Sequence, residues 1–495
     1  MKPVSQKSKI YLFILLASLT APVLVITSNF FPYTGLGLTL LAYTSIAYII
    51  KKDKNIFSKS FFVVTFLLTI CLFIRSEGFL TFLNITGIIY FASLSLSERL
   101  NSDRDIISVV ISPLNLILRS LSIRSEFKPD AKSLRFLHKK NDEKKNTFIV
   151  TVFTCTSLAV ILPLLASANP IFKKLLSDII NLFGLKNLHF TDNVFLWIFR
   201  FIVSAVLIFI IPKIATYSNK KQVSLFNIRG YMNMLIPKTT VSFVLIIFFI
   251  TQIQLYFVTP QTLSDLGYTY SRYANEVFAQ LSTVGAIILA ILYFEKEDKK
   301  INNIFTHLLS FEGIFLNLMA YKSAIDYISS WGFTYKRLYG IVLASLIMGM
   351  FIIFLYGSYK KLNKTLIFKS SLIYTGLILL LINFINFDYI IYNCGKASTG
   401  QGIDYAYLAR LSPDSLSYQE QFKRLSEINL KYPENIIILN NNSEGAYTLL
   451  NKIENLQKKY RNNDFRSFSL LEYLQYKKIE EIDIKYARET LLSKL

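Results

Sequence analysis

The sequence has few charged residues and very few of the side chains that commonly bind metals or carry catalysis. Only 17% of its 495 residues are charged, and it contains 3 histidines, 3 cysteines and 2 tryptophans. His138, His189 and His307 are scattered, and no CxxC motif or Cys/His cluster occurs. We therefore predict no metal site, no cofactor and no intrachain disulfide framework.

Recognisable enzyme motifs are also missing. The sequence contains no Walker-type loop, no HExxH and no GxSxG. The first loop that we expect outside the cytoplasm, Ser28–Tyr33, has no acidic residue, although a glycosyltransferase with a lipid-phosphate donor would be expected to carry one there. Enzymatic activity is therefore left open, and a non-enzymatic role is favoured.

Long apolar stretches dominate the chain up to about Asp388. Hydrophobic residues make up 53% of the sequence, and uncharged windows of about 17–20 residues are typical of membrane spans. We predict spans at 10–28, 35–50, 60–74, 78–96, 147–168, 194–216, 239–258, 277–294, 304–321, 338–357 and 369–387. The sequence thus predicts an all-α integral membrane protein with about 11 transmembrane helices and a mainly helical C-terminal region.

The basic residues are concentrated in alternate loops. If the N-terminus is cytoplasmic, the loops inside hold 30 Lys and Arg and the loops outside hold 8. The positive-inside rule then places the N-terminus in the cytoplasm of a bacterial inner membrane and the C-terminal region outside it. This explains the net charge of +22 without nucleic acid, and it predicts contacts between the inside loops and anionic lipid headgroups.

Four segments follow from this topology. They are an N-terminal four-span region (1–96), a basic cytoplasmic loop (97–146), a seven-span region (147–387) and an extracytoplasmic tail (388–495). Within the loop, Ile106–Ser122 is predicted to be an interfacial helix, with a further span as the alternative. The first span is read as an uncleaved signal anchor, although cleavage after Ala21 stays open.

The tail is predicted to fold into short amphipathic helices. Ser412-Pro413-Asp414 is typical of a helix start, with a capping serine before a proline. A second helix is expected at about 444–460, and two more at Phe468–Tyr476 and Ile479–Leu492. The segment Tyr432–Leu439 is expected to be a linker or a short strand. These helices would bury their apolar faces together or against the outer membrane surface.

Glu312 is the most informative single residue, because it lies near the centre of the ninth apolar stretch. A carboxylate at that depth is costly, roughly 2.5–3.5 kcal/mol for a central Asp, and normally faces a partner or water. His307 and Asn317 lie five positions away, off its face, so the partner is expected from another span. Arg200 and Gln252 are the candidates, with a proton or ion relay or a simple helix contact as the alternative roles.

Two loops on the predicted outer side carry further binding candidates. Tyr270 and Arg272 lie in the loop at 259–276, and Thr334 and Arg337 precede the tenth span. Aromatic residues at such edges usually anchor the helix at the interface, so a ligand-binding role competes with anchoring.

Four segments together resemble a bacterial polytopic membrane family known only as a domain of unknown function. They are Leu164–Phe172 (LLASANPIF), Tyr268–Ala274 (YTYSRYA), Ser323-Ala324 with Trp331–Arg337 (WGFTYKR), and Asp404–Ser415 (DYAYLARLSPDS). The second departs from the family pattern, because Asn275-Glu276-Val277 follows where Arg-Gly-Phe is expected. The resemblance covers roughly residues 145–475 and implies an outer surface built by loops and tail, but no activity.

Three functions are compatible with these observations. The favoured one is a non-enzymatic envelope sensor, assembly factor or scaffold that binds an envelope protein or ligand through its outer loops and tail. The alternatives are a transporter or permease with an intramembrane carboxylate at Glu312, and a membrane enzyme acting on a lipid-linked or envelope substrate.

Overall fold

The computed structural model describes residues 33–50, 56–96, 142–182, 234–256, 270–293, 300–394, 398–399, 402–427, 436–462 and 465–492. Its long helices are α2 (Tyr33–Ile50), α3 (Ile56–Ile74), α4 (Gly78–Leu96), α7 (Asp142–Ala168), α8 (Pro170–Leu182), α10 (Leu235–Tyr256), α12 (Tyr270–Tyr293), α13 (Lys300–Trp331), α14 (Tyr335–Tyr359) and α15 (Lys364–Phe384). The tail contains α16 (Phe387–Asn393), β1 (Ser398–Thr399), β2 (Gly402–Ile403), α17 (Tyr405–Ala409), η4 (Pro413–Ser415), α18 (Tyr418–Glu427), α19 (Ile436–Arg461), η5 (Phe465–Ser467), α20 (Leu470–Ile479) and α21 (Ile484–Leu492).

The architecture is helical, as predicted. Each predicted span inside the described residues falls on a helix, and 6 of these helices are long and apolar enough to cross a membrane. They are α3, α4, α10, α13, α14 and α15, whereas α2, α7 and α12 carry shorter apolar segments. The predicted spans at 10–28 and 194–216, Arg200 and the segment Ile106–Ser122 lie outside the described residues.

The tail differs from its prediction in three local details. Ser412 does cap a helical turn, since its Oγ accepts a hydrogen bond from the Asp414 N–H, but that turn is the three-residue 3₁₀ helix η4. The following helix, α18, begins only at Tyr418. Helix α19 begins at Ile436, so the end of the predicted linker or strand is helical. The described strands, β1 and β2, form one antiparallel pair of two residues each.

Two compact units make up the chain. Unit 1 contains Met1–Ser102, Ile328–Val342 and Leu372–Leu495, and unit 2 contains Asp103–Tyr327 and Leu343–Ser371. Helices α13, α14 and α15 therefore contribute residues to both. The boundaries of these units differ from those of the four segments predicted from the sequence. The four segments stay a prediction.

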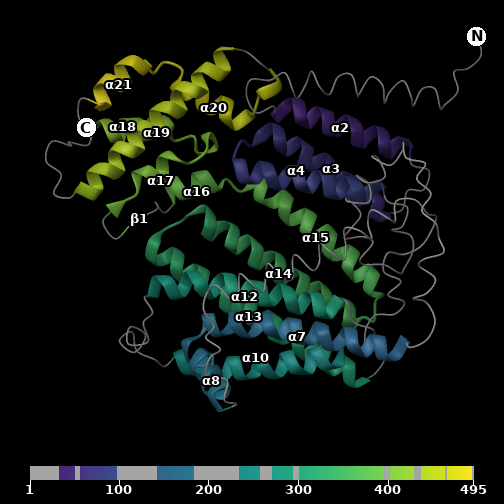
Figure 1. The fold of residues 1–495 in the computed structure, drawn as a ribbon. Coiled ribbons are helices and arrows are strands. Elements are labelled where there is room, and N and C mark those ends of the chain that lie inside the picture. The colour runs from purple at the N-terminus through teal and green to yellow at the C-terminus, as the bar shows by residue number, and fades with distance from the viewer. Residues whose placement is uncertain are drawn as a thin grey trace, which may run out of the picture. The chain divides into compact units, whose positions relative to one another are not determined.

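Unit 2 is a helical bundle in which α7 packs against α10 and α12, while α8 packs against α7 and α10 (Figure 1). Its apolar core includes Ile161, Leu245, Leu292 and Phe351, which are completely buried. Close packing is helped by Gly313, because a Cβ there would lie 2.3 Å from the Phe351 ring. The bundle is held together mainly by dispersion and the fit of small residues against large ones.

Unit 1 joins the hairpin of α3 and α4 to the tail. In the tail, α19 packs against α17, α18, α20 and α21, and its Leu449, Leu450 and Ile453 are fully buried between them. A second apolar cluster connects the start of α4 and the end of α15 with α16 and α17, through Leu80, Ile382, Ile391 and Leu408 among others. The tail is thus packed directly on the ends of the membrane helices of its own unit.

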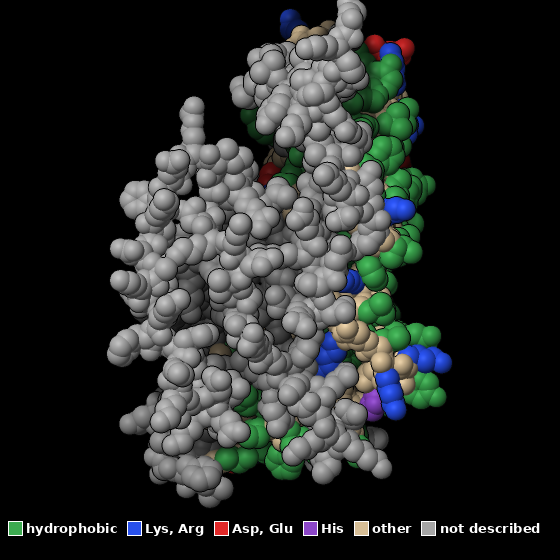
Figure 2. Space-filling view, turned by 90° about the vertical axis from the view of Figure 1, so that its right-hand side faces the viewer, with side chains coloured by type: hydrophobic (Ala, Val, Ile, Leu, Met, Phe, Trp, Pro, Cys, Tyr) green, Lys and Arg blue, Asp and Glu red, His purple; other side chains and the backbone are tan. Residues whose placement is uncertain are grey.

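Many large apolar side chains remain on the surface of the membrane helices. Phe82, Phe243, Phe311 and Ile352 are each more than half exposed, in contrast to the tail helices, whose apolar residues mostly face inward. Figure 2 shows one face on which the described side chains are largely hydrophobic, with lysine and arginine side chains among them. Such apolar exposure is expected of helices whose solvent is lipid.

Candidate functional site

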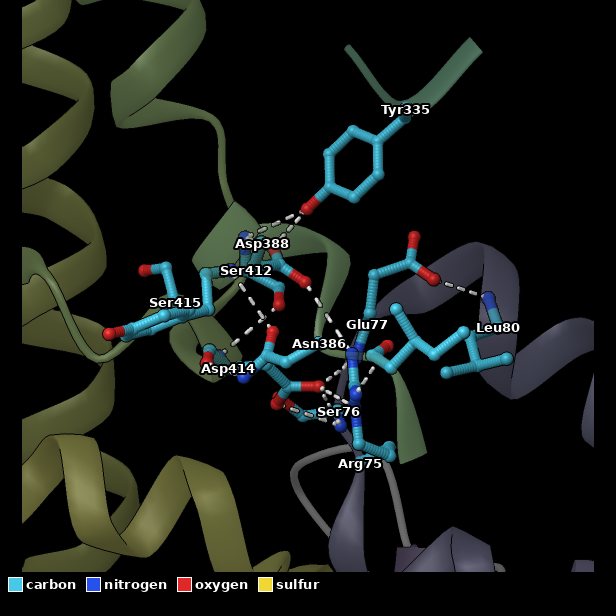
Figure 3. A network of polar contacts seen from close by, with 12 residues as sticks. Arg75, Ser76, Glu77, Leu80, Tyr335, Asn386, Asp388, Ser412, Asp414 and Ser415 are labelled. Atoms are coloured by element: carbon cyan, nitrogen blue, oxygen red, sulfur yellow. Dashed lines mark hydrogen bonds and ion pairs between the residues drawn. The ribbon is translucent and has the colours of Figure 1, made fainter. Parts of the chain in front are cut away.

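The turn between α3 and α4 carries three consecutive polar residues, and all three are buried. Arg75 is 3% exposed, Ser76 6% and Glu77 7%. They lie where α3 ends and α4 begins, so their side chains meet the unpaired backbone groups of helix ends. Together with Asp388 and Asp414, which are fully buried, they form what we call the charged junction (Figure 3).

Arg75 is the centre of this junction. Its Nε donates to Asp414 Oδ2 at 2.7 Å, and its Nη2 lies 3.8 Å from Asp388 Oδ2. Its Nη1 donates to the carbonyl oxygens of Asn383 and Ile385, both at 3.2 Å. Because those carbonyls lie at the end of α15, the guanidinium caps that helix while neutralising carboxylates of the tail.

Asp414 belongs to η4, yet its carboxylate is held at the start of α4. It accepts hydrogen bonds from the Ser76 N–H at 3.0 Å and from the Ser76 hydroxyl at 2.6 Å. A carboxylate at the N-terminal end of a helix is favoured by unpaired N–H groups and by the helix dipole. The Asp414 carbonyl in turn accepts from Asn386 Nδ2 at 2.7 Å, so both ends of this residue are fixed.

Asp388, in the first turn of α16, connects the junction to α14 and to the motif at 404–415. Its Oδ1 accepts from the Ser412 N–H at 2.7 Å and from the Tyr335 hydroxyl. The Tyr335 N–H donates to the Tyr407 hydroxyl at 2.9 Å. Two of the family-like segments, WGFTYKR and DYAYLARLSPDS, therefore meet at this carboxylate.

Glu77 is the residue of the charged junction that lies next to α4. Its Oε1 accepts from the Phe79 N–H at 3.0 Å, its Oε2 accepts from the Leu80 N–H, and both contacts cap the helix that begins at Gly78. The Tyr339 hydroxyl donates to the same Oε2 at 2.7 Å. This carboxylate thus ties α14 to α4.

The junction has more negative than positive groups, since one arginine faces three carboxylates. Burial, followed by the negative charge of Asp414, raises the pKa of Asp388 to about 7. Asp388 Oδ2 is buried and has no hydrogen-bond partner, which fits a carboxyl that is readily protonated. No group of His, Cys, Asp and Glu side chains suited to a metal ion occurs in the described part of the chain.

A second polar cluster lies inside unit 2, between α10 and α13. Glu312 is 6% exposed, and its Oε1 accepts from the Ser242 hydroxyl at 2.7 Å. One turn earlier on α10, the fully buried Lys238 donates to the Thr306 hydroxyl at 2.6 Å. Glu312 Oε2 is buried without a hydrogen-bond partner. Among the described residues, the partner of Glu312 comes from another span, as predicted, and it is Ser242 rather than Gln252. Arg200 lies outside the described residues.

Gln252 serves a different contact. Asn169 Nδ2 donates to Gln252 Oε1 at 3.0 Å and to Thr251 Oγ1 at 3.1 Å. The Asn169 side-chain oxygen accepts from the N–H groups of Ile171 and Phe172, which caps α8. The segment LLASANPIF therefore has a physical role in this chain, because its asparagine joins α7, α8 and α10.

The remaining predicted residues lie apart from both clusters. Thr334 precedes α14, and its carbonyl accepts from the N–H groups of Arg337 and Leu338. Arg337 Nη1 donates to the carbonyls of Trp331 and Gly332, which caps the end of α13. Tyr270 and Arg272 lie in the first turn of α12, and the structure does not describe their side chains.

Sequence reasoning identified Glu312 but missed Lys238 and the charged junction. It counted Arg75 among outer-loop charges and Lys238 among inner-loop charges, because both lie next to apolar stretches. The available signal was that Arg75 is the one basic residue in a three-residue turn between two long apolar segments. A charge in so short a turn has little room to reach water.

Comparison with known proteins agrees with the resemblance noted from the motifs. No curated protein and no solved structure matches the chain. A family model does match, over residues 62–421, and its matched region includes Arg75, Glu77, Asp388 and Asp414 of the charged junction as well as Glu312. The chain therefore belongs to the family described as a domain of unknown function, DUF4153.

Proposed function

We propose that this protein is a non-enzymatic scaffold or sensor of the bacterial inner membrane, whose tail presents a fixed surface to an envelope protein or ligand. The observation that carries the proposal is the charged junction. In this junction, four buried charged side chains attach the tail to the ends of α3, α4 and α15. A flexible appendage would not need such an attachment.

The chemistry of the junction supports a mechanical role. Its carboxylates are occupied by capping and ion-pair contacts, so they are poorly placed to act on a substrate. Breaking a buried ion pair is costly because the remaining charge stays unpaired in a low dielectric. The junction can therefore transmit a displacement of the tail to the membrane helices, or hold the tail still while a partner binds.

The proposed topology has about eleven spans, with the N-terminus in the cytoplasm and the tail outside. The loop charges support it through the positive-inside rule. Cys394 provides a direct test, because it is exposed whereas Cys71 is buried. In a Cys155→Ser background, a membrane-impermeant maleimide should label Cys394 in intact cells. Labelling only after lysis would place the tail in the cytoplasm.

The role itself can be tested by complementing a chromosomal deletion. For a scaffold, chains with Asp414→Leu or lacking 388–495 should fail to restore the phenotype, whereas Glu312→Gln should restore it at equal abundance. Immunoblotting of membranes controls for the amount of each variant. Restoration by Asp414→Leu together with failure of Glu312→Gln would reject the scaffold.

A transporter is the second candidate, and one observation favours it. Lys238 and Glu312 are ionisable, buried and close to one another along α10 and α13, which is typical of ion or proton pathways. In that case Glu312→Gln would abolish the phenotype while membrane abundance stays normal. Asp414→Leu would then have an effect only through a loss of abundance.

A further inference from the structure

Helix α20 carries apolar side chains on two of its sides. Tyr476 and Ile479 face the core of the tail. Leu470 and Leu474, one turn apart, are 42% and 43% exposed. Because these two leucines lie on a different side of the helix from Tyr476 and Ile479, a further apolar surface is expected against them.

A third exposed apolar residue lies in the preceding turn. Phe465, in η5, is 61% exposed and lies just before α20 in the chain. In a water-exposed domain three such residues in one segment would be a liability, since exposed apolar patches promote association. We refer to Phe465, Leu470 and Leu474 as the η5–α20 face.

Two hydrogen bonds from side-chain hydroxyls to backbone carbonyls fix the position of this segment relative to α2 and α3. The Thr34 hydroxyl, in the first turn of α2, donates to the Phe468 carbonyl at 2.8 Å. The Ser469 hydroxyl donates to the carbonyl of Ile74, the last residue of α3, at 3.2 Å. The segment from η5 to α20 thus lies beside the ends of α2 and α3 (Figure 1). On the proposed topology these helix ends are at the outer boundary of the membrane.

We propose that the η5–α20 face is a membrane-binding surface that inserts into the bilayer interface on the tail side. The occupant is lipid, because the face lies beside the ends of α2 and α3, and α3 is long and apolar enough to cross a membrane. Interfacial helices bury apolar residues about 5–10 Å into the boundary between headgroups and acyl chains. This surface goes beyond the proposed function and holds whether the protein is a scaffold or a transporter.

Two lysines follow on the next turn of α20, and both have partners within the tail. Lys477 pairs with Glu480 at 2.7 Å, and Lys478 donates to the Leu416 carbonyl at 3.2 Å. The first is a local pair at the end of α20, and the second joins that end to the residue after η4. The predicted contact with lipid is therefore apolar, and high salt should not weaken it.

Site-directed spin labelling of the full chain can test the proposal. Single cysteines replace Leu470 or Leu474 in a Cys155→Ser, Cys394→Ser background, where Cys71 is too buried to react. The protein is reconstituted into phosphatidylethanolamine–phosphatidylglycerol vesicles. Power saturation then compares the access of oxygen, which concentrates in lipid, with that of a water-soluble nickel chelate.

Three exposed positions provide matched references. Phe384, at the end of α15, is 76% exposed and represents the membrane level, while Tyr447 on α19 and Tyr486 on α21 represent water. Labels at 470 and 474 should favour oxygen as the label at 384 does, and labels at 447 and 486 should favour nickel. Nickel access at 470 and 474, or exclusion of both reagents by a covering protein, would overturn the proposal.

A second measurement avoids dependence on cysteine variants that fold poorly. Leu474→Trp should be quenched by brominated lipids more strongly than Tyr447→Trp, with the native tryptophans as a constant background. Equal quenching of the two variants would count against insertion.

Discussion

The two units bury carboxylates in opposite ways. In unit 1, Glu77 and Asp414 each accept hydrogen bonds from at least three donors, and half of the donors are backbone N–H groups at helix ends. In unit 2, Glu312 accepts one hydrogen bond among the described residues, from Ser242, and its second oxygen has no partner among them. In the first arrangement the carboxylates are fully hydrogen-bonded, whereas in the second one carboxylate oxygen can still bind a proton or another ligand.

This difference predicts how much the stability of the folded chain depends on each buried carboxylate. A well-satisfied buried ion cluster resists change and loses much stability when one partner is removed. A carboxylate with one donor can change its protonation state or partner at smaller structural cost. Variants of the unit 1 cluster should therefore lose more stability than variants of Glu312.

The largest effect is expected from Arg75→Ala. It leaves Asp388 and Asp414 buried without their cation and removes the cap of α15, so unfolding should become easier by about 3–5 kcal/mol. Denaturant unfolding in detergent measures this change. Arg410→Ala is the matched control, because the Arg410–Glu444 pair is exposed and should contribute only about 0–1 kcal/mol.

Arg75→Lys keeps the charge but loses the planar group that reaches a carboxylate and two carbonyls at once. Its loss of stability should fall between those of Arg75→Ala and Arg410→Ala. If Arg75→Ala and Arg410→Ala unfold alike, the junction does not anchor the tail.

Much of unit 2 and the helical tail could be predicted from sequence, and the junction could not. Apolar length located the helices, and the cost of a charge in lipid indicated that Glu312 needs a partner from another span. The identity of that partner depends on which faces of α10 and α13 meet, and periodicity does not specify this. Arg75 and Asp414 are separated by 339 positions, so nothing local links them.

The motif at 404–415 also shows which contacts can be predicted from sequence and which cannot. Its serine cap was predicted correctly from Ser412 and Pro413, because capping depends on neighbouring residues. The role of Asp414 in the same motif depends on a distant turn and was missed. Local rules therefore recovered the cap, and only the three-dimensional structure revealed the ion pair.

The second largest effect concerns pH. Because the pKa of folded Asp388 is raised to about 7, above its unfolded value of about 3.9, the folded chain holds more protons between these values. Stability should therefore fall as pH rises from about 4 through about 7, with a slope of at most about 1.4 kcal/mol per pH unit.

Asp388→Asn should remove this part of the slope, while Glu420→Gln in the exposed Glu420–Arg424 pair should keep it. Unfolding curves between pH 5 and pH 8 measure the difference. An unchanged slope in Asp388→Asn would show that another group binds the proton.

A third prediction addresses the carboxylate with one donor. Ser242→Ala leaves both oxygens of Glu312 without a partner among the described residues, which should cost about 1–3 kcal/mol. Ser60→Ala is the control, since its hydroxyl bonds only to the Ile56 carbonyl of its own helix and is exposed. A cost equal to that of the control would mean that Glu312 finds another donor.

The smallest effect is expected where a carboxylate loses one donor of several. Tyr339→Phe removes the hydroxyl that bonds to Glu77 Oε2, but the N–H groups of Phe79 and Leu80 still satisfy that side chain. The cost should be about 0.5–1.5 kcal/mol, below that of Ser242→Ala, although both variants delete one hydroxyl facing a buried carboxylate. Unfolding of the two variants in the same detergent gives the comparison directly. A larger loss in Tyr339→Phe than in Ser242→Ala would mean that the number of donors does not decide how these two units hold their buried charges.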